Sequence, residues 1–130
     1  MVAVAMKNII LVEDNPDNAD LVMDMLEDLY DITLYGNGPD LLAALEEADS
    51  KAPDLFLLDI GLPGIDGVDL MKKLKTMASV QNIPALALTA HAMMDDEPRL
   101  MEAGFSGYVS KPIIDETAFT DKIEKLIGAP

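Results

Sequence analysis

The sequence predicts an α/β domain in which five strands alternate with five helices. Two observations support this prediction: short apolar runs recur along the 130 residues, and a segment with helical periodicity follows each of them. Three of the runs are continuously apolar, which is typical of parallel strands that helices cover on both faces. The alternation therefore indicates a doubly wound parallel sheet, and the length fits a single domain.

The predicted strands differ in how apolar they are. Segments 9–12, 55–58 and 85–88 contain only apolar residues, so we expect them at the centre of the sheet. Segments 32–35 and 108–110 mix polar and apolar residues, so we expect them at its edges.

The starts of the helices carry recognisable signals. Asn15 can cap the first helix, and Pro16 suits its first position. The second helix is expected to follow Gly38 and Pro39. Asp66 and Asp115 can cap the third and fifth helices in the same way as Asn15.

Each helix also needs a buried face, which apolar residues at spacings of three and four provide. We expect the fourth helix to run from about Asp96 to Ala103 and to stop at Gly104. The apolar stripes of the other helices are Val22, Met25, Leu26 and Leu29; Leu41, Ala44, Leu45 and Ala48; Gly67, Leu70, Met71 and Leu74; and Phe119, Ile123, Leu126 and Ile127.

The composition excludes several classes of function. A net charge of −15 disfavours binding to nucleic acid or to an anionic membrane surface. The absence of cysteine removes disulfides and thiol catalysis, and it fits a cytoplasmic protein. No apolar run approaches the roughly 20 residues of a membrane span. Either Met1 or Met6 can be the native start.

Polar side chains follow four of the five predicted strands. The first strand ends in Glu13 and Asp14, the third in Asp59 and the fourth in Thr89, while Lys111 follows the fifth. The carboxyl ends of parallel strands meet at one edge of the sheet, which is where ligands of such folds bind. We therefore expect these five side chains to form a site.

The chemistry of these residues favours phosphoryl transfer. If the first and third strands are neighbours, Glu13, Asp14 and Asp59 converge and repel one another unless a cation intervenes. An all-oxygen cluster suits Mg²⁺. The two positive charges of the ion and that of Lys111 together balance the negative charges of the three carboxylates. Lys111 can pair with a phosphate oxygen, and Thr89 supplies a hydroxyl donor. A carboxylate nucleophile beside these groups has the parts that phosphoryl transfer needs.

The motifs around these residues resemble the receiver domain of two-component response regulators, of the single-domain type found in chemotaxis. The resemblance covers about Lys7 to Ile127 and implies a flavodoxin-like sheet of strand order 2-1-3-4-5. The matching segments are Val12-Glu13-Asp14-Asn15-Pro16, Leu58-Asp59-Ile60-Gly61-Leu62-Pro63-Gly64-Ile65-Asp66-Gly67, Leu88-Thr89-Ala90, Gly104-Phe105 and Tyr108-Val109-Ser110-Lys111-Pro112.

The resemblance implies a role for each site residue. Glu13 and Asp14 would hold Mg²⁺, and the backbone carbonyl of Gly61 would be a further ligand. Asp59 would be both a metal ligand and the phosphoacceptor.

The other roles concern the phosphoryl group and the response to it. By the same resemblance, Thr89 and Lys111 would bind the phosphoryl group, Tyr108 would change rotamer as a switch, and the Lys111-Pro112 peptide would be cis. His91 lies two residues beyond Thr89, near the expected approach of water. It either tunes hydrolysis of the aspartyl phosphate or is a solvent-exposed histidine without a role.

The resemblance implies a stand-alone regulator rather than an enzyme with a separate substrate. A sensor histidine kinase or a histidine phosphotransfer protein would donate the phosphoryl group to Asp59. The domain would catalyse its own phosphorylation and a slow autodephosphorylation. With a core at about 7–127 we expect no output domain, so a separate target protein would receive the signal.

Several alternatives remain open from the sequence. The domain could be a terminal switch, a phosphorelay carrier, a phosphate sink or an inert receiver-like interaction module. A phosphatase of the haloacid dehalogenase type is disfavoured, because its Asp-x-Asp motif follows the first strand, whereas here the candidate nucleophile follows the third and position 61 is glycine. A flavodoxin is disfavoured because two carboxylates replace a hydroxyl-rich phosphate loop.

Overall fold

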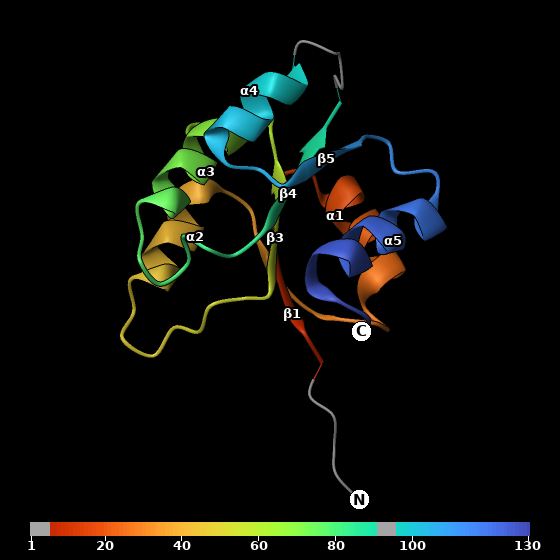
Figure 1. Cartoon of the computed structure of the whole chain (residues 1–130), viewed down its shortest axis with the longest axis horizontal. Helices are drawn as coiled ribbons and strands as arrows, with labels where there is room; N and C mark the ends of the chain where they lie inside the picture. Colours follow the sequence, from red (N-terminus) through yellow and green to blue (C-terminus); the bar gives the residue numbers. More distant parts are fainter. Residues whose placement is uncertain (1–5, 91–95) are drawn as a thin grey trace, which may run out of the picture.

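The computed structural model describes residues 6–90 and 96–130 of the chain. Within these residues, strands and helices alternate as the sequence predicts (Figure 1). The strands are β1 (Asn8–Val12), β2 (Asp31–Tyr35), β3 (Leu55–Asp59), β4 (Ala85–Thr89) and β5 (Gly107–Ser110). The helices are α1 (Pro16–Leu26), α2 (Gly38–Leu45), α3 (Gly67–Lys75), α4 (Asp96–Ala103) and α5 (Glu116–Ile127).

The strands form one parallel sheet of order β2-β1-β3-β4-β5, which confirms the predicted topology. Every residue of β3 and β4 is buried, whereas the edge strands β2 and β5 are largely exposed or half-buried. The continuous apolarity of 55–58 and 85–88 therefore predicted the central strands correctly, and the mixed segments are the edges.

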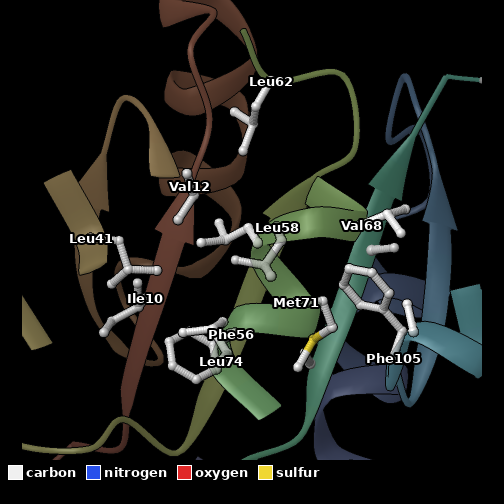
Figure 2. Close-up of a cluster of buried hydrophobic side chains, with 14 of the residues drawn as sticks. Ile10, Val12, Leu41, Phe56, Leu58, Leu62, Val68, Met71, Leu74 and Phe105 are labelled. Carbon is white, nitrogen blue, oxygen red and sulfur yellow. The ribbon is translucent and has the colours of Figure 1, made fainter. Parts of the chain in front are cut away.

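Helices cover both faces of the sheet, so the chain has two apolar cores. The core under α2, α3 and α4 contains Phe56, Leu58 and Phe105 (Figure 2). The core under α1 and α5 contains Leu57 and Phe119 from the opposite face. Because successive strand residues point to opposite faces, each central strand contributes to both cores.

The predicted helix caps are confirmed. The side chain of Asn15 accepts hydrogen bonds from the backbone of Asp17 and Asn18 at 2.9 and 3.3 Å. Asp66 and Asp115 cap α3 and α5 in the same way. These caps fix where each helix leaves the carboxyl edge of the sheet.

Two predicted apolar stripes extend beyond their helices. Leu29 lies after the end of α1 and is 38% exposed, because the chain turns there and buries Tyr30 instead, at 1% exposed. The backbone N–H of Tyr30 donates to the carbonyl of Leu26 in this turn. Ala48 is likewise exposed, because α2 ends at Leu45, whose carbonyl accepts the hydroxyl of Ser50 at 3.0 Å.

The two ends of the described fold meet at the amino-terminal edge of the sheet. The Lys7 ammonium, just before β1, donates to the carbonyls of Ile127 and Ala129 at 2.6 and 2.9 Å. This contact stabilises the last turn of α5, because a cation is favoured at a helix carboxyl end.

None of the helices in the described part of the chain has the length and apolar character of a membrane-spanning segment.

Candidate functional site

The carboxyl edge of the sheet gathers the predicted polar residues. Glu13 follows β1, Asp59 and Thr89 end β3 and β4, and Lys111 follows β5. Glu13 and Asp59 are each 3% exposed and Thr89 is 5% exposed; apart from Tyr30, no other polar or charged side chain is buried in the described part of the chain. Three buried polar groups at one edge, above apolar strands, indicate a site built for a ligand.

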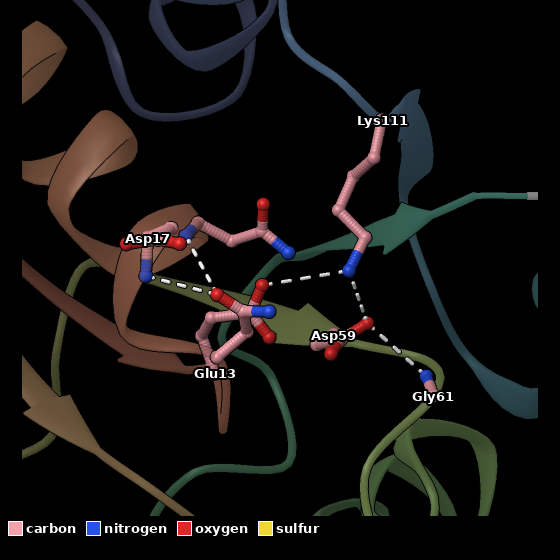
Figure 3. Close-up of polar contacts among 7 residues, drawn as sticks. Glu13, Asp17, Asp59, Gly61 and Lys111 are labelled. Carbon is pink, nitrogen blue, oxygen red and sulfur yellow. Dashed lines mark hydrogen bonds and ion pairs between the residues drawn. The ribbon is translucent and has the colours of Figure 1, made fainter.

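Lys111 lies between the two buried carboxylates. Its Nζ is 2.9 Å from Oδ1 of Asp59 and 3.4 Å from Oε1 of Glu13 (Figure 3). The same Oδ1 accepts the backbone N–H of Gly61 at 3.1 Å. The Lys111-Pro112 peptide is cis, as expected from the family resemblance. Two donors on one oxygen fix the orientation of the Asp59 carboxylate.

A pocket of about 350 Å³ opens onto this cluster. Asp14, Gly61 and Ala90 contribute to its lining together with Asp59, Thr89 and Lys111, whereas Glu13 does not line it. Asn18, in the first turn of α1, also lines the pocket, and sequence reasoning did not identify it. Asn18 could have been predicted from its position three residues after the capping residue Asn15, because residues at this spacing lie on the same face of a helix.

The donor set of the pocket fits a hard divalent cation. One carboxylate oxygen each from Glu13, Asp14 and Asp59 lie within 4.8 Å of one another. Oxygens around a magnesium ion are at most about 4.2 Å apart, so small side-chain rotations would bring these onto one ion. Oε2 of Glu13 is buried without a hydrogen-bond partner among the described residues, and such an atom is costly unless a ligand satisfies it.

The pKa of Glu13 reflects this unsatisfied environment. Burial, and then the neighbouring carboxylate of Asp59, raise the pKa of Glu13 from 4.5 to about 7. Lys111 opposes this shift but does not cancel it. Two carboxylates beside one lysine therefore leave an excess of negative charge that a cation would neutralise.

Asp59 behaves in the opposite way. Burial alone would raise its pKa, but its contacts with Glu13 and Lys111 and the N–H of Gly61 outweigh burial, so the pKa of Asp59 lies below its usual 3.8. Burial would lower the pKa of Lys111, but Asp59 and Glu13 raise it above 10.5. Asp59 is therefore an ionised carboxylate near neutral pH, the form that a nucleophile requires.

These shifts predict how the stability of the metal-free protein depends on pH. Glu13 holds its proton more tightly in the folded state, so the free energy of unfolding should fall by a few kcal/mol as pH rises from about 4.5 to above 7. The shifts of Asp59 and Lys111 act below and above this window. Urea unfolding in a chelator, at several pH values, measures the fall.

A matched pair of variants isolates the contribution of Glu13. Glu13→Gln should flatten the profile, because the side chain can no longer ionise. Glu102→Gln, the same change at an exposed position on α4, should retain it. An equal fall in parent and Glu13→Gln proteins would show that Glu13 ionises freely and would contradict the raised pKa.

Besides Glu13, two further predicted residues are not part of the pocket lining as described. Tyr108 is half-buried on β5 and does not line it, and its ring contacts Lys122. His91 lies outside the residues that the structure describes, so the hypothesis about its role stays a prediction. For Gly61, the N–H bond to Asp59 is described, whereas metal ligation by its carbonyl stays a prediction.

Comparison with known proteins identifies the class to which this fold and site belong. The family model described as the response regulator receiver domain matches residues 9–124, so the chain belongs to the response regulator receiver family. It is thus a signalling domain of two-component systems, and a phosphoacceptor switch is consistent with its family.

One curated relative and two solved structures are similar to the chain over nearly its whole length. The polar-differentiation response regulator DivK of Brucella anthropi is 38% identical over 123 residues, which span 94% of this chain and 97% of DivK. The receiver domain of the sensor histidine kinase PA1611 from Pseudomonas aeruginosa, whose structure has magnesium coordinated in the active-site cleft, is 30% identical, with a TM-score of 0.82 over 96% of this chain and all of that one. The phosphorylated cyanobacterial phytochrome response regulator RcpA is 26% identical, with a TM-score of 0.80 over 95% of this chain and 94% of that one.

Proposed function

We propose that the protein is a single-domain response regulator of about residues 7–127 that accepts a phosphoryl group on Asp59. The observation that carries the proposal is the buried Asp59 carboxylate, which Lys111 contacts at 2.9 Å and which lines the 350 Å³ pocket. The similarity to the response regulator DivK, over nearly the whole of both chains, also supports the proposal.

The proposed reaction transfers the phosphoryl group between two nucleophiles. A carboxylate oxygen of Asp59 attacks phosphorus and forms an O–P bond, while the P–N bond of a phosphohistidine breaks and its electron pair returns to the imidazole. The donor is a sensor histidine kinase or a histidine phosphotransfer protein. Lys111 then pairs with the transferred phosphoryl oxygens, and the hydroxyl of Thr89 donates to them.

A metal would complete the site. Glu13, Asp14, Asp59 and the carbonyl of Gly61 would hold Mg²⁺, which when bound neutralises charge that develops on the phosphoryl oxygens. The family relative with coordinated magnesium supports this assignment. Because the groups of the domain itself carry the chemistry, small phosphodonors should work as well, and slow autodephosphorylation should follow.

Signal output follows from the change in charge at Asp59. An aspartyl phosphate carries more negative charge than the carboxylate that it replaces, which draws Thr89 inward and changes the orientation of Tyr108. The surface of α4, β5 and α5 then binds a separate, cytoplasmic target protein with a different affinity.

The experiment that tests the proposal measures covalent phosphorylation directly. The purified protein is incubated with acetyl phosphate and Mg²⁺, and its intact mass is recorded with and without a chelator. One added phosphoryl group that requires the metal is the expected result. If no adduct forms, beryllofluoride binding is measured, because it does not depend on the lifetime of the ester. Failure of both would favour an inert receiver-like interaction module.

Magnesium should also stabilise the fold without any phosphodonor. A ligand that binds only the folded state at a hundredfold excess over its Kd raises the free energy of unfolding by about 2.7 kcal/mol. Urea unfolding at neutral pH, with Mg²⁺ or with a chelator, measures this gain. Asp14→Asn should reduce it, because Asp14 is the exposed member of the carboxylate cluster and its loss leaves the buried pair in place. Identical unfolding midpoints with and without Mg²⁺ would argue against a metal site here.

A further inference from the structure

Lys122 on α5 contacts Tyr108 on β5 in two ways. Its Nζ donates to the backbone carbonyl of Tyr108 at 2.5 Å, and it stands 5.1 Å from the centroid of the Tyr108 ring. A cation within about 6 Å of an aromatic centroid is attracted by the ring. The same ammonium therefore fixes both the main chain and the side chain of one residue.

The contact reaches around the edge of the sheet. Tyr108 packs against the core under α2, α3 and α4, whereas the neighbours of Lys122 on α5, Phe119 and Ile123, belong to the core on the opposite face. β5 is an edge strand, so one side of its backbone has no strand partner. Lys122 satisfies a carbonyl on that open side and touches a ring that belongs to the other face.

This position links α5 to the expected switch residue. Tyr108 is half-buried, so its ring is not locked by a complete shell of neighbours. A hollow of about 590 Å³ between β5 and α5, lined in part by Tyr108, Ile114 and Lys122, leaves the pair accessible. A group that bound the Lys122 ammonium would remove its contact with the Tyr108 ring. Because such coupling is reciprocal, a change in the orientation of the ring would equally release Lys122.

We infer that Lys122 is a positioning residue that holds the Tyr108 ring at the edge of β5 in the unphosphorylated protein. The inference rests on the proposed switch role of Tyr108 and extends it to a second residue. Because the contact belongs to the conformation described here, its loss should favour the activated state. An exposed cation–π contact corresponds to about a two- to fivefold change in an equilibrium constant.

The test uses the full chain with its three tyrosines replaced by fluorotyrosine. A Tyr108→Phe variant lacks one of the three resonances and so identifies the one that belongs to Tyr108. The ¹⁹F spectrum reports the environment of the Tyr108 ring, and a Mg²⁺-beryllofluoride titration reports the apparent affinity of the site. Lys122→Met keeps the length of the side chain and removes its charge and its donor. Lys122→Arg restores both. Lys125→Met makes the same change at an exposed position one turn further along α5.

Lys122→Met should shift the Tyr108 resonance and tighten beryllofluoride binding about two- to fivefold. Lys122→Arg and Lys125→Met should match the parent protein in both measurements. An unmoved Tyr108 resonance in Lys122→Met would overturn the positioning role, and so would an unchanged or weaker affinity for beryllofluoride. If the parent binds no beryllofluoride, the proposed function fails instead, and the spectra of the variants still decide whether Lys122 positions the ring.

Discussion

Asp59→Asn should abolish phosphorylation by acetyl phosphate. The amide of asparagine is not a nucleophile comparable to a carboxylate, and no other buried carboxylate at the described edge of the sheet combines a lowered pKa with contact to Lys111. We expect the initial rate of adduct formation to fall by at least about a hundredfold. Intact-mass measurement over time, in saturating Mg²⁺, gives this rate.

The control must remove one negative charge without touching the site. Asp24→Asn does so at an exposed position on α1, and it should be phosphorylated at the parent rate. Circular dichroism of both variants checks that the fold is retained. A phosphoryl adduct on Asp59→Asn that forms as fast as on the parent protein would mean that another residue is the acceptor.

Gly67→Ala should be among the most destabilising single substitutions in this protein. Gly67 begins α3, and its N–H donates to the carbonyl of Ile60 at 3.1 Å. A Cβ at this position would lie 2.4 Å from the backbone oxygen of Asp59 and 2.8 Å from Cα of Ile60. Backbone cannot move aside as a flexible side chain can, so we expect a loss of roughly 3 kcal/mol in the free energy of unfolding.

The same clash should affect the site, because the backbone oxygen that the new Cβ would approach belongs to Asp59, the candidate phosphoacceptor. Shifting the main chain of Asp59 would change its distance to Lys111, so Mg²⁺ should stabilise Gly67→Ala less than the parent. Gly36→Ala is the matched control, since a Cβ there has no atom within 4 Å. It should change stability by less than about 1 kcal/mol. Equal urea midpoints for the two variants would show that the β3–α3 connection tolerates a side chain.

Much of the fold could be predicted because local and tertiary signals agree. The run 55–58 contains only apolar residues. A strand that is buried on both faces needs apolar residues at every position, whereas a strand with one exposed face alternates apolar and polar residues. Asn15, Asp66 and Asp115 are capping residues by chemistry, and each accepts the backbone hydrogen bond that capping implies. The convergence of Glu13 and Asp59 followed from parallel neighbouring strands.

What the sequence could not predict depends on contacts between distant segments. Periodicity continued through Leu29 and Ala48, but where a helix ends is decided by the turn that follows it, and the turn after α1 buries Tyr30. The side chain of Asn37 caps α2, but the start of this helix was expected after Gly38 and Pro39, and the cap was not predicted. The contact between Lys122 and Tyr108 spans two elements and has no local signature at all.

The meeting of Lys7 with the carbonyls of Ile127 and Ala129 has a practical consequence. Both ends of the described fold lie beside each other, at the edge of the sheet opposite the acidic pocket. A fluorescent reporter or an immobilisation tag at either end would therefore stand clear of the pocket, and a short peptide linker could join the two ends in a circular permutant.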